Sequence, residues 1–433
     1  MNPVLPAESF IPDGEGRWMP DGRFYVYGSC DICGAEDFYC SDVLHVFSSE
    51  NLVHWVDHGV CLRSSDITWA KGGRMLYAPD CIYKDGKYYL YFCMNDGREG
   101  VATADTPYGY FHDPVPVEYA DGDGIDPAVL VDDDGQVYYF WGQFSLRGAR
   151  IKNDMHSLDR STLNPMILTE RQHGFHEGAS IRKRNGLYYL VFTDISRGRA
   201  TCLSYAVSRS PLGPYEKRGT IIDNIDCDPE TWNNHGSIAE FNGQWYVLYH
   251  RSSQNSRYNR RLCMEPISFE KNGDIKEVVM TTQGVEPPLQ MDQKISAARA
   301  CMVRGGAYSK PVKDGSFEVL SHLCSRCYAA YRYIDFDFPR KISITASSIA
   351  PNVRVEVWAD DGKIGTCTIE NTGGWENWKE FFCDLEPVSG VKTLYFVCSG
   401  ESGGMGNRLL EIRDFTFLSD TGINESINAM ACR

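Results

Sequence analysis

The stretch DGKYYLYFC at Asp85 to Cys93 decides the fold, because close variants of it occur five times in the first 250 residues. In each copy, a turn glycine is followed by a run of aromatic and β-branched residues. The other copies are DGRFYVYGS (Asp21 to Ser29), DGQVYYFWG (Asp134 to Gly142), NGLYYLVFT (Asn185 to Thr193) and NGQWYVLYH (Asn242 to His250). The turn glycines are Gly22, Gly86, Gly135, Gly186 and Gly243, spaced 64, 49, 51 and 57 residues apart. A β-type repeat of about this period is typical of a propeller or a solenoid.

The turn chemistry agrees with this interpretation. Asp-Gly or Asn-Gly between two apolar runs is a strong hairpin signal, because both residues tolerate a positive φ. A strand-like stretch precedes each turn, the aromatic strand follows it, and a third strand comes after. Five such units without a long amphipathic helix predict an all-β fold whose first part is a five-bladed β-propeller. The alternative is a plain β-sandwich with chance repeats.

The repeat also predicts which residues meet. The first strand of each blade lines the central channel of a propeller, so equivalent positions converge on the axis. The residues nine positions before the turn glycines are, in chain order, Asp13, Tyr77, Asp126, Glu177 and Asn234, the last of them next to His235. Three carboxylates from three blades are therefore expected to face one channel, with a histidine from a fourth.

Carboxylates crowded in a channel raise one another's pKa, which is costly unless the protein uses them. They supply what glycoside hydrolysis needs, namely a protonated acid beside the leaving oxygen and an ionised base for water. The alternative is that these residues cap strand ends, since Asp13 and Asp126 both lie in turn-like PDG and IDP contexts. Their common offset favours a functional role.

Several motifs together resemble glycoside hydrolase family 43, over roughly residues 2 to 290. They are NPVLP at the N-terminus, PDG at Asp13, GIDPAVLVDDDG around Asp126, HEGASIRKRNGLYYLVFT around Glu177, and NNHGSIAEFNGQWYVLYHR around His235. The resemblance implies a five-bladed propeller of inverting glycosidases that act on arabinose- and xylose-containing glycans. It implies Asp13 as general base, Glu177 as general acid, and Asp126 as the group that orients the acid and tunes its pKa.

The same resemblance implies a calcium ion held through water near His235, and no organic cofactor. One departure concerns the base. The chain reads PDGEG where the family usually has DPD or DPS after the N-terminal proline motif. Glu15 is therefore an alternative to Asp13 as the general base.

Sugar rings have apolar faces on which aromatic side chains stack, and Trp69, Tyr77 and Trp232 are the candidates here. Trp141 lies inside a strand and is expected to pack in the core. Asp80 either binds sugar hydroxyls or caps a strand. Of the pair Arg260 and Arg261 before the last strand, we expect Arg261 to contact the sugar, as the family often places an arginine there; a surface role is the alternative.

The repeat stops at a linker, VEPPLQMDQ, between Val285 and Gln293. We predict a propeller over 1–290, a β-sandwich (jelly roll) over 296–419 and a tail over 420–433, because short alternating strands with polar turns follow the linker. The stretch from Thr372 to Gly400 resembles carbohydrate-binding module family 6. Trp375 and Trp378 there either stack on sugar or pack the sandwich, and packing is favoured.

The chain has 433 residues, with 58 acidic and 43 basic side chains and a net charge of −15. This balance argues against nucleic acid or an anionic membrane as partner, and no apolar run approaches the roughly 20 residues that span a bilayer. The first residues lack a signal-peptide pattern, so a cytoplasmic location and reduced thiols are expected for the 16 cysteines. The pattern leaves the oligomeric state open.

The function predicted from these observations is an inverting exo-glycosidase that releases terminal α-L-arabinofuranose or β-D-xylose from arabinoxylan-type oligosaccharides. One alternative is a carbohydrate-binding propeller without catalysis. Another is an endo-arabinanase or a galactan exo-hydrolase on the same scaffold.

Overall fold

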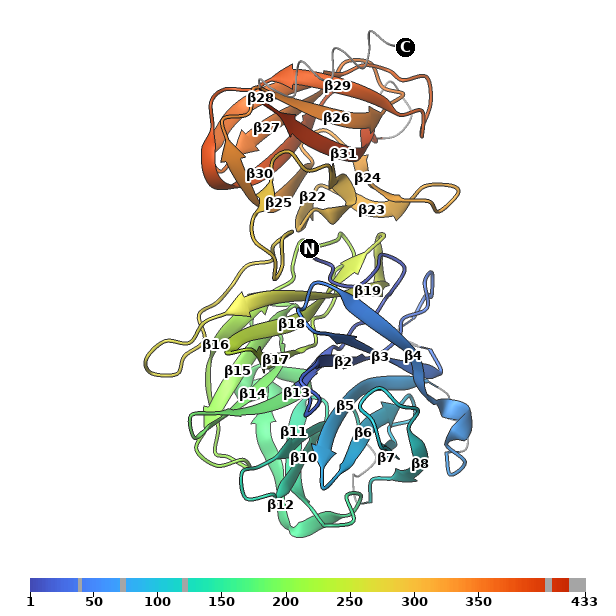
Figure 1. The fold of residues 1–433 in the computed structure, drawn as a ribbon, viewed down its shortest axis with the longest axis vertical. Coiled ribbons are helices and arrows are strands. Elements are labelled where there is room, and N and C mark those ends of the chain that lie inside the picture. Colours follow the sequence, from blue (N-terminus) through green and yellow to red (C-terminus); the bar gives the residue numbers. More distant parts are fainter. Residues whose placement is uncertain (38–40, 71–74, 119–123, 402–406, 420–433) are drawn as a thin grey trace.

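The protein is an all-β chain of two domains stacked along its long axis (Figure 1). The structure, a computed structural model, describes residues 1–37, 41–70, 75–118, 124–401 and 407–419. Within these residues the longest helix is the single turn α1 (Glu170–His173), beside the 3₁₀ turns η1 (Ser64–Asp66) and η2 (Ala297–Arg299). No helix among them is long and apolar enough to cross a membrane.

The propeller predicted from the repeat is confirmed, with five antiparallel sheets in the described residues. Each of the first four has four strands and the fifth has three. Blade one holds β1 (Glu15–Trp18), β2 (Phe24–Gly28), β3 (Val43–Ser49) and β4 (Trp55–Arg63); blade two holds β5 (Leu76–Lys84), β6 (Lys87–Met94), β7 (Glu99–Ala104) and β8 (His112–Pro116). Blade three holds β9 (Ala128–Val131), β10 (Val137–Trp141), β11 (Ser145–Ile151) and β12 (Leu158–Thr169); blade four holds β13 (Phe175–Arg184), β14 (Leu187–Asp194), β15 (Cys202–Ser208) and β16 (Glu216–Asp223). Blade five holds β17 (Ser237–Phe241), β18 (Gln244–Ser253) and β19 (Ser256–Ile267).

The turn glycines lie where the repeat predicts them, between the first and second strand of each blade. All five have a positive φ, between 73° and 85°. In three blades the preceding residue, Asp85, Asn185 or Asn242, also has a positive φ. A two-residue hairpin turn of this kind matches the twist of the strands that it joins.

Blades pack on one another through the apolar faces of their aromatic strands. Leu44 and Leu62 of blade one share a buried cluster with Leu90 and Phe92 of blade two. A parallel bridge between Gly14 and Gly236 joins the start of the first blade to the last. The ring is therefore closed, and the start of every first strand is held near the axis.

The second domain is the predicted β-sandwich, with two sheets around one apolar core. One sheet has β22 (Met302–Arg304), β20 (Leu289–Gln290), β25 (Tyr328–Asp337), β30 (Ser389–Ser399), β27 (Val353–Ala359) and β28 (Gly362–Ile369). The other has β21 (Ile295–Ser296), β23 (Tyr308–Pro311), β24 (Glu318–Leu323), β31 (Leu410–Leu418), β26 (Lys341–Ser347) and β29 (Lys379–Asp384). The predicted linker thus already contains a sandwich strand, β20, and the predicted tail at 420–433 lies outside the described residues.

The two tryptophans of the sandwich are engaged by protein groups. The Arg408 guanidinium lies 3.6 Å from the Trp375 ring centroid, and Trp378 meets Phe317 edge to face at 6.0 Å. Both contacts support the packing interpretation.

The prediction that the cysteines are reduced is wrong for one pair, because Cys324 and Cys327 form a disulfide in the turn between β24 and β25. Their spacing places the two Cα atoms 5.2 Å apart, within reach of a disulfide.

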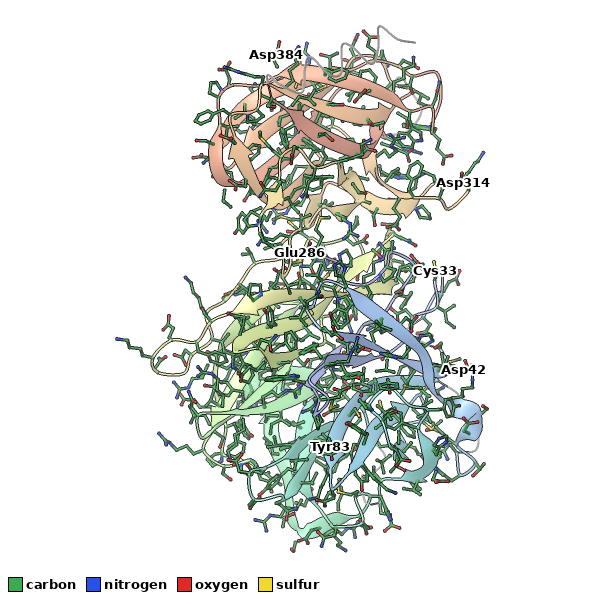
Figure 2. All side chains as sticks on the ribbon, in the orientation of Figure 1. Cys33, Asp42, Tyr83, Glu286, Asp314 and Asp384 are labelled. Carbon is green, nitrogen blue, oxygen red and sulfur yellow. A yellow bond between two sulfur atoms is a disulfide. The ribbon has the colours of Figure 1, made fainter. Side chains whose placement is uncertain are left out.

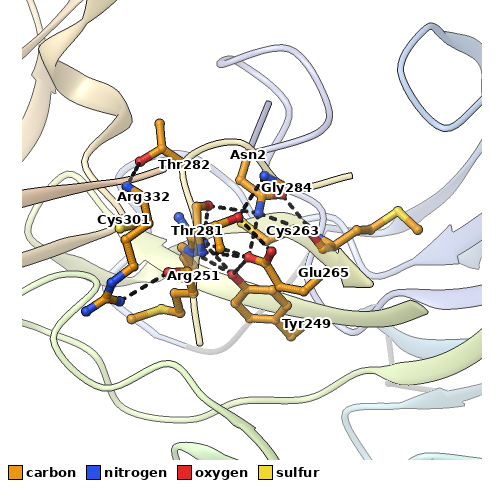
Figure 3. Close-up of polar contacts among 12 residues, drawn as sticks. Asn2, Tyr249, Arg251, Cys263, Glu265, Thr281, Thr282, Gly284, Cys301 and Arg332 are labelled. Carbon is orange, nitrogen blue, oxygen red and sulfur yellow. Dashed lines mark hydrogen bonds and ion pairs between the residues drawn. The ribbon is translucent and has the colours of Figure 1, made fainter. Parts of the chain in front are cut away.

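The junction of the domains is a polar network that includes the chain start. Glu286, labelled between the domains in Figure 2, pairs with the amino group of Met1. Behind it, the buried Glu265 accepts hydrogen bonds from Asn2, Tyr249 and Thr281 (Figure 3). The N-terminus, the last blade and the linker are therefore tied into one unit.

Candidate active site

A cavity of about 620 Å³ opens where the first strands of the blades begin. All three carboxylates of the predicted cluster, Asp13, Asp126 and Glu177, line it. Each comes from a different blade, and each lies within two residues of the start of a first strand. The repeat register therefore brings them together as predicted.

Asp13 is buried among groups that stabilise its negative charge. The Ser29 hydroxyl donates to Oδ2 at 2.6 Å and the Arg260 guanidinium donates to Oδ1 at 3.2 Å. The imidazole Nδ1 atoms of His235 and His250 lie 3.5 and 3.6 Å from Oδ1. Burial alone would raise the pKa of Asp13, but these neighbours, Arg260 above all, lower it to about 2. Asp13 is thus an ionised carboxylate, ready to accept a proton.

Asp126 is in a different electrostatic state. Its Oδ2 accepts the Gly178 backbone N–H at 2.9 Å, and it is as buried as Asp13. Burial, and then the neighbouring carboxylates Glu177 and Asp13, raise its pKa to about 7 against the opposing effect of His235. Asp126 therefore changes its charge near neutral pH.

Glu177 lies on β13 at an irregular point of the strand. Its Oε2 accepts a hydrogen bond from Gln143 Nε2 at 2.7 Å. Regular pairing with β14 is interrupted on both sides of Glu177, and Gly178 has a φ of 68°. A Cβ at Gly178 would lie 2.9 Å from the His235 ring, so this position requires glycine. The bulge sets Glu177 beside Asp126, with an amide fixing one of its oxygens.

Glu15, the rival base, lies next to the site but is already paired. Its Oε1 accepts from Ser180 Oγ at 3.3 Å and forms ion pairs with Arg182 and Arg17. It does not line the cavity. Two guanidinium groups neutralise its charge, so the geometry favours Asp13.

Of the predicted sugar-binding residues, Tyr77 and Trp232 line the cavity. Trp232 is 48% exposed, with the Arg257 guanidinium 4.9 Å from its ring centroid. Its ring is therefore held at the cavity wall with apolar surface still accessible to a sugar.

Three other predicted contacts are corrected, since none of these residues lines the cavity. Trp69 packs against the core of blade two, and its indole N–H donates to the Pro114 carbonyl at 2.8 Å. Asp80 is buried, with its carboxylate taken up by Arg17 and by the Val129 N–H at 2.7 Å.

The third correction is Arg261, which points away from the cavity and pairs with Glu318 of the sandwich at 2.8 Å. Its neighbour Arg260 is the one that reaches the site. Successive side chains of a strand point to opposite faces, and both arginines lie within β19. Trp141 is fully buried in the core, as expected.

The sequence argument missed several cavity residues that follow the second strands. Gln143 holds Glu177, and Phe144 is 52% exposed with a φ of 60°. Phe144 meets His176 edge to face at 5.1 Å. A bulky residue in the left-handed region is an outlier that is often found at functional sites.

A second register in the sequence identifies further neighbours of the carboxylates. The residues seven positions after the turn glycines are Ser29, Cys93, Gly142, Thr193 and His250. Ser29 donates to Asp13, Cys93 Sγ accepts the Asp126 N–H at 3.4 Å, and His250 lies beside Asp13. The ends of the second strands thus surround the carboxylates that the first strands supply.

The surroundings of His235 do not form a direct calcium site. Calcium takes about 6–8 oxygen ligands, whereas the described residues contain no group of three or more His, Cys, Asp or Glu side chains placed to hold a metal. The imidazole lies against Gly178 and Asp13. A water-bridged calcium ion near His235 stays a prediction.

An all-β propeller that gathers an aspartate and a glutamate from different blades in one cavity has the pair of carboxyl groups that glycosidic bond hydrolysis requires. The class that fold and site define is a glycoside hydrolase. The chain belongs to glycosyl hydrolases family 43, whose family model matches residues 2–275. The model of the family 6 carbohydrate binding module matches residues 325–419.

The chain is similar to a xylosidase/arabinosidase from Thermoclostridium stercorarium, with 28% identity over 97% of this chain and 99% of the relative. A solved β-xylosidase/α-arabinofuranosidase of family 43 from a compost metagenome, in complex with xylotriose and in a calcium-free form, is 30% identical. It covers 64% of this chain and 97% of its own, with a TM-score of 0.57. An arabinoxylan arabinofuranohydrolase from Bacillus subtilis shares the fold over 96% of this chain and 97% of its own, at 24% identity and a TM-score of 0.56.

Proposed function

We propose that this glycoside hydrolase is an inverting, exo-acting enzyme that removes terminal α-L-arabinofuranose or β-D-xylose from arabinoxylan-type oligosaccharides. The observation that carries the proposal is the contrast between two carboxyl groups in one cavity. Asp13 is held ionised by Arg260 and Ser29, while Glu177 is oriented by Gln143. The names of the similar proteins, xylosidase/arabinosidase among them, support the choice of sugars.

The mechanism is a single displacement. Asp13 takes a proton from a water molecule while the water oxygen bonds to the anomeric carbon. Glu177 gives its proton to the glycosidic oxygen while the bond between that oxygen and the anomeric carbon breaks. The sugar leaves with inverted configuration, and no covalent intermediate forms.

Asp126 acts on the acid without touching the broken bond. It lies beside Glu177, and its Oδ2 fixes the backbone of the next residue, Gly178. Its role in the proposed mechanism is to hold the backbone that carries Glu177, and so to orient the acid toward the glycosidic oxygen.

The test separates the two roles by leaving group. Glu177→Gln should slow the hydrolysis of xylo- and arabino-oligosaccharides by about 10²–10⁴-fold and spare a dinitrophenyl pentoside, whose leaving group needs no proton. Asp13→Asn should lose both substrates, because no group activates the water. Proton NMR of the first product should show the inverted anomer.

The control is Asp133→Asn, a carboxylate that is 84% exposed and pairs with Lys183 on the surface; it should behave as the wild type. Equal loss of both substrates in Glu177→Gln, or substantial activity in Asp13→Asn, would show that the roles are misassigned. If the wild type had no activity on pentosides, the proposal that it releases arabinose or xylose would be wrong.

A further inference from the structure

The sandwich reaches the propeller through a carboxylate that no catalytic role explains. Glu318, the first residue of β24, accepts Arg261 Nη1 on one oxygen and Arg261 Nη2 on the other, both at 2.8 Å. Its Oε1 also accepts Gln254 Nε2 at 2.6 Å. The ion pair is buried, with the Arg261 side chain 5% and the Glu318 side chain 14% exposed. A bidentate, water-excluded pair of this kind fixes geometry as well as charge.

The propeller partners of Glu318 both belong to one hairpin. Gln254 lies in the turn between β18 and β19, where it and Asn255 adopt positive φ values of 60° and 53°. Gln254 Oε1 accepts a hydrogen bond from Asn259 Nδ2 at 2.9 Å, which links the turn to β19. Arg261 lies two residues after Asn259 on the same strand. Glu318 therefore holds the hairpin at its turn and on its strand.

The opposite face of the same strand reaches the catalytic cavity. Arg260 donates to Asp13 Oδ1 at 3.2 Å, and its Nε and Nη2 donate to Asp31 at 3.0 and 2.9 Å. Arg260 and Arg261 are adjacent and point to opposite sides of β19. A shift of the strand that frees Arg261 also moves Arg260 relative to Asp13.

We propose that Glu318 is a positioning residue for the hydrolase: through Arg261 and Gln254 it sets the β18–β19 hairpin, and through that hairpin the guanidinium of Arg260 against Asp13. The sandwich thereby completes the active site, in addition to any contact that it makes with sugar. This inference rests on the proposed role of Asp13.

The experiment compares Glu318→Gln and Arg261→Lys with Arg304→Gln in the full chain. Arg304 pairs with Asp226 across the same junction at 2.6 Å but does not touch β19. We expect kcat on a xylo- or arabino-oligosaccharide to fall about 10- to 100-fold in the first two variants, with KM within about twofold. Arg304→Gln should keep both constants.

Two further measurements separate positioning from stability. Thermal unfolding establishes that each variant is fully folded at the assay temperature, and Arg261→Lys carries the test if Glu318→Gln does not fold. The double variant Glu318→Gln with Arg261→Gln should lose less activity than the product of the two single losses, since the two residues share one contact.

Unchanged kcat in a folded Glu318→Gln or Arg261→Lys enzyme would overturn the inference, as would an equal loss in Arg304→Gln. If Asp13→Asn is inactive while Glu318→Gln is unimpaired, the proposed function stands and only this inference fails. If Asp13→Asn keeps substantial activity, the role of Asp13 fails first.

Discussion

Asp13 keeps a negative charge at a point that water hardly reaches. Burial of a carboxylate normally favours its neutral form, and Asp126, equally buried and without a guanidinium partner, shows that effect with a pKa of about 7. Asp13 differs because Arg260 and Ser29 donate to its two oxygens. The same residue type thus has two different pKa values in one cavity, and the difference lies in the neighbours of Asp13, Ser29 from its own blade and Arg260 from the last blade.

At the same scale, two exposed aromatic residues define the cavity wall. Phe144 adjoins Gln143, the partner of Glu177, so in the proposed mechanism it lies on the side from which the leaving group departs. We predict that Phe144→Ala and Trp232→Ala raise KM for oligosaccharides about three- to tenfold. Phe144→Ala should leave inhibition by the free monosaccharide unchanged, because the monosaccharide does not extend to the leaving-group side.

The control for these substitutions is Trp18→Ala. Trp18 is similarly exposed, at 50%, but lies outside the cavity and packs against Phe241. An equal rise of KM in Trp18→Ala, or no change in either cavity variant, would contradict the prediction that Phe144 and Trp232 contact the sugar.

At the scale of the elements, the blade is a unit that presents chemistry at two fixed places. The first strand begins at the cavity and the second strand ends there, because the hairpin turn between them lies at the far end. Residues nine before and seven after the turn glycine therefore meet in every blade. This explains why the three carboxylates share one offset, and why Ser29, which donates to Asp13, lies at the other.

The last blade carries a buried acid of another kind. Burial raises the pKa of Glu265 to about 7, against the opposing charge of Arg251 and the Thr281 hydrogen bonds. The pKa in the folded state thus exceeds the ordinary value of 4.5. The stability contributed by this group is fully present below pH 4.5 and is lost as the pH rises through about 7.

We therefore predict that Glu265→Gln gains stability relative to the wild type as the pH rises from about 4.5 to 8, by up to about 3 kcal/mol. Urea unfolding of both proteins at the two pH values measures the difference. A stability difference that is the same at both pH values would show that Glu265 ionises normally in the folded protein.

At the scale of the whole molecule, the chain behaves as one structure built from two domains. The Val4 N–H donates to the Leu262 carbonyl of the last blade, and the Asn2 N–H donates to the Thr282 carbonyl just before the linker. The Glu318 and Arg261 pair adds a link from the sandwich to β19. We expect the sandwich to matter for catalysis even where it binds no sugar.

The predicted calcium ion also belongs to this scale, since His235 precedes the last blade near the axis that all blades share. An ion that binds only the folded state raises its stability by mass action. Adding CaCl₂ after EDTA treatment should therefore raise the Tm, and equimolar MgCl₂ should raise it less because magnesium demands near-octahedral geometry with short ligand distances, whereas calcium accepts about 6–8 ligands in flexible geometry. A Tm that neither EDTA nor CaCl₂ changes would exclude the ion.

The sequence by itself determined the propeller, the sandwich and the cluster of Asp13, Asp126 and Glu177. The propeller and the cluster follow from local chemistry repeated in a fixed register: a turn glycine, an aromatic strand, and a polar residue at a constant offset. The sandwich follows from short alternating strands with polar turns. Such information needs no knowledge of what lies across the ring.

Only the tertiary structure decided the partners. Arg260 and not Arg261 lines the cavity, because successive side chains of β19 point to opposite faces and the face with Arg261 meets the sandwich. Asp80 and Trp69 do not belong to the sugar site, because they bind Arg17 and the Pro114 carbonyl, which are distant in sequence. Charge state and availability depend on contacts between distant residues, and a repeat pattern does not contain those contacts.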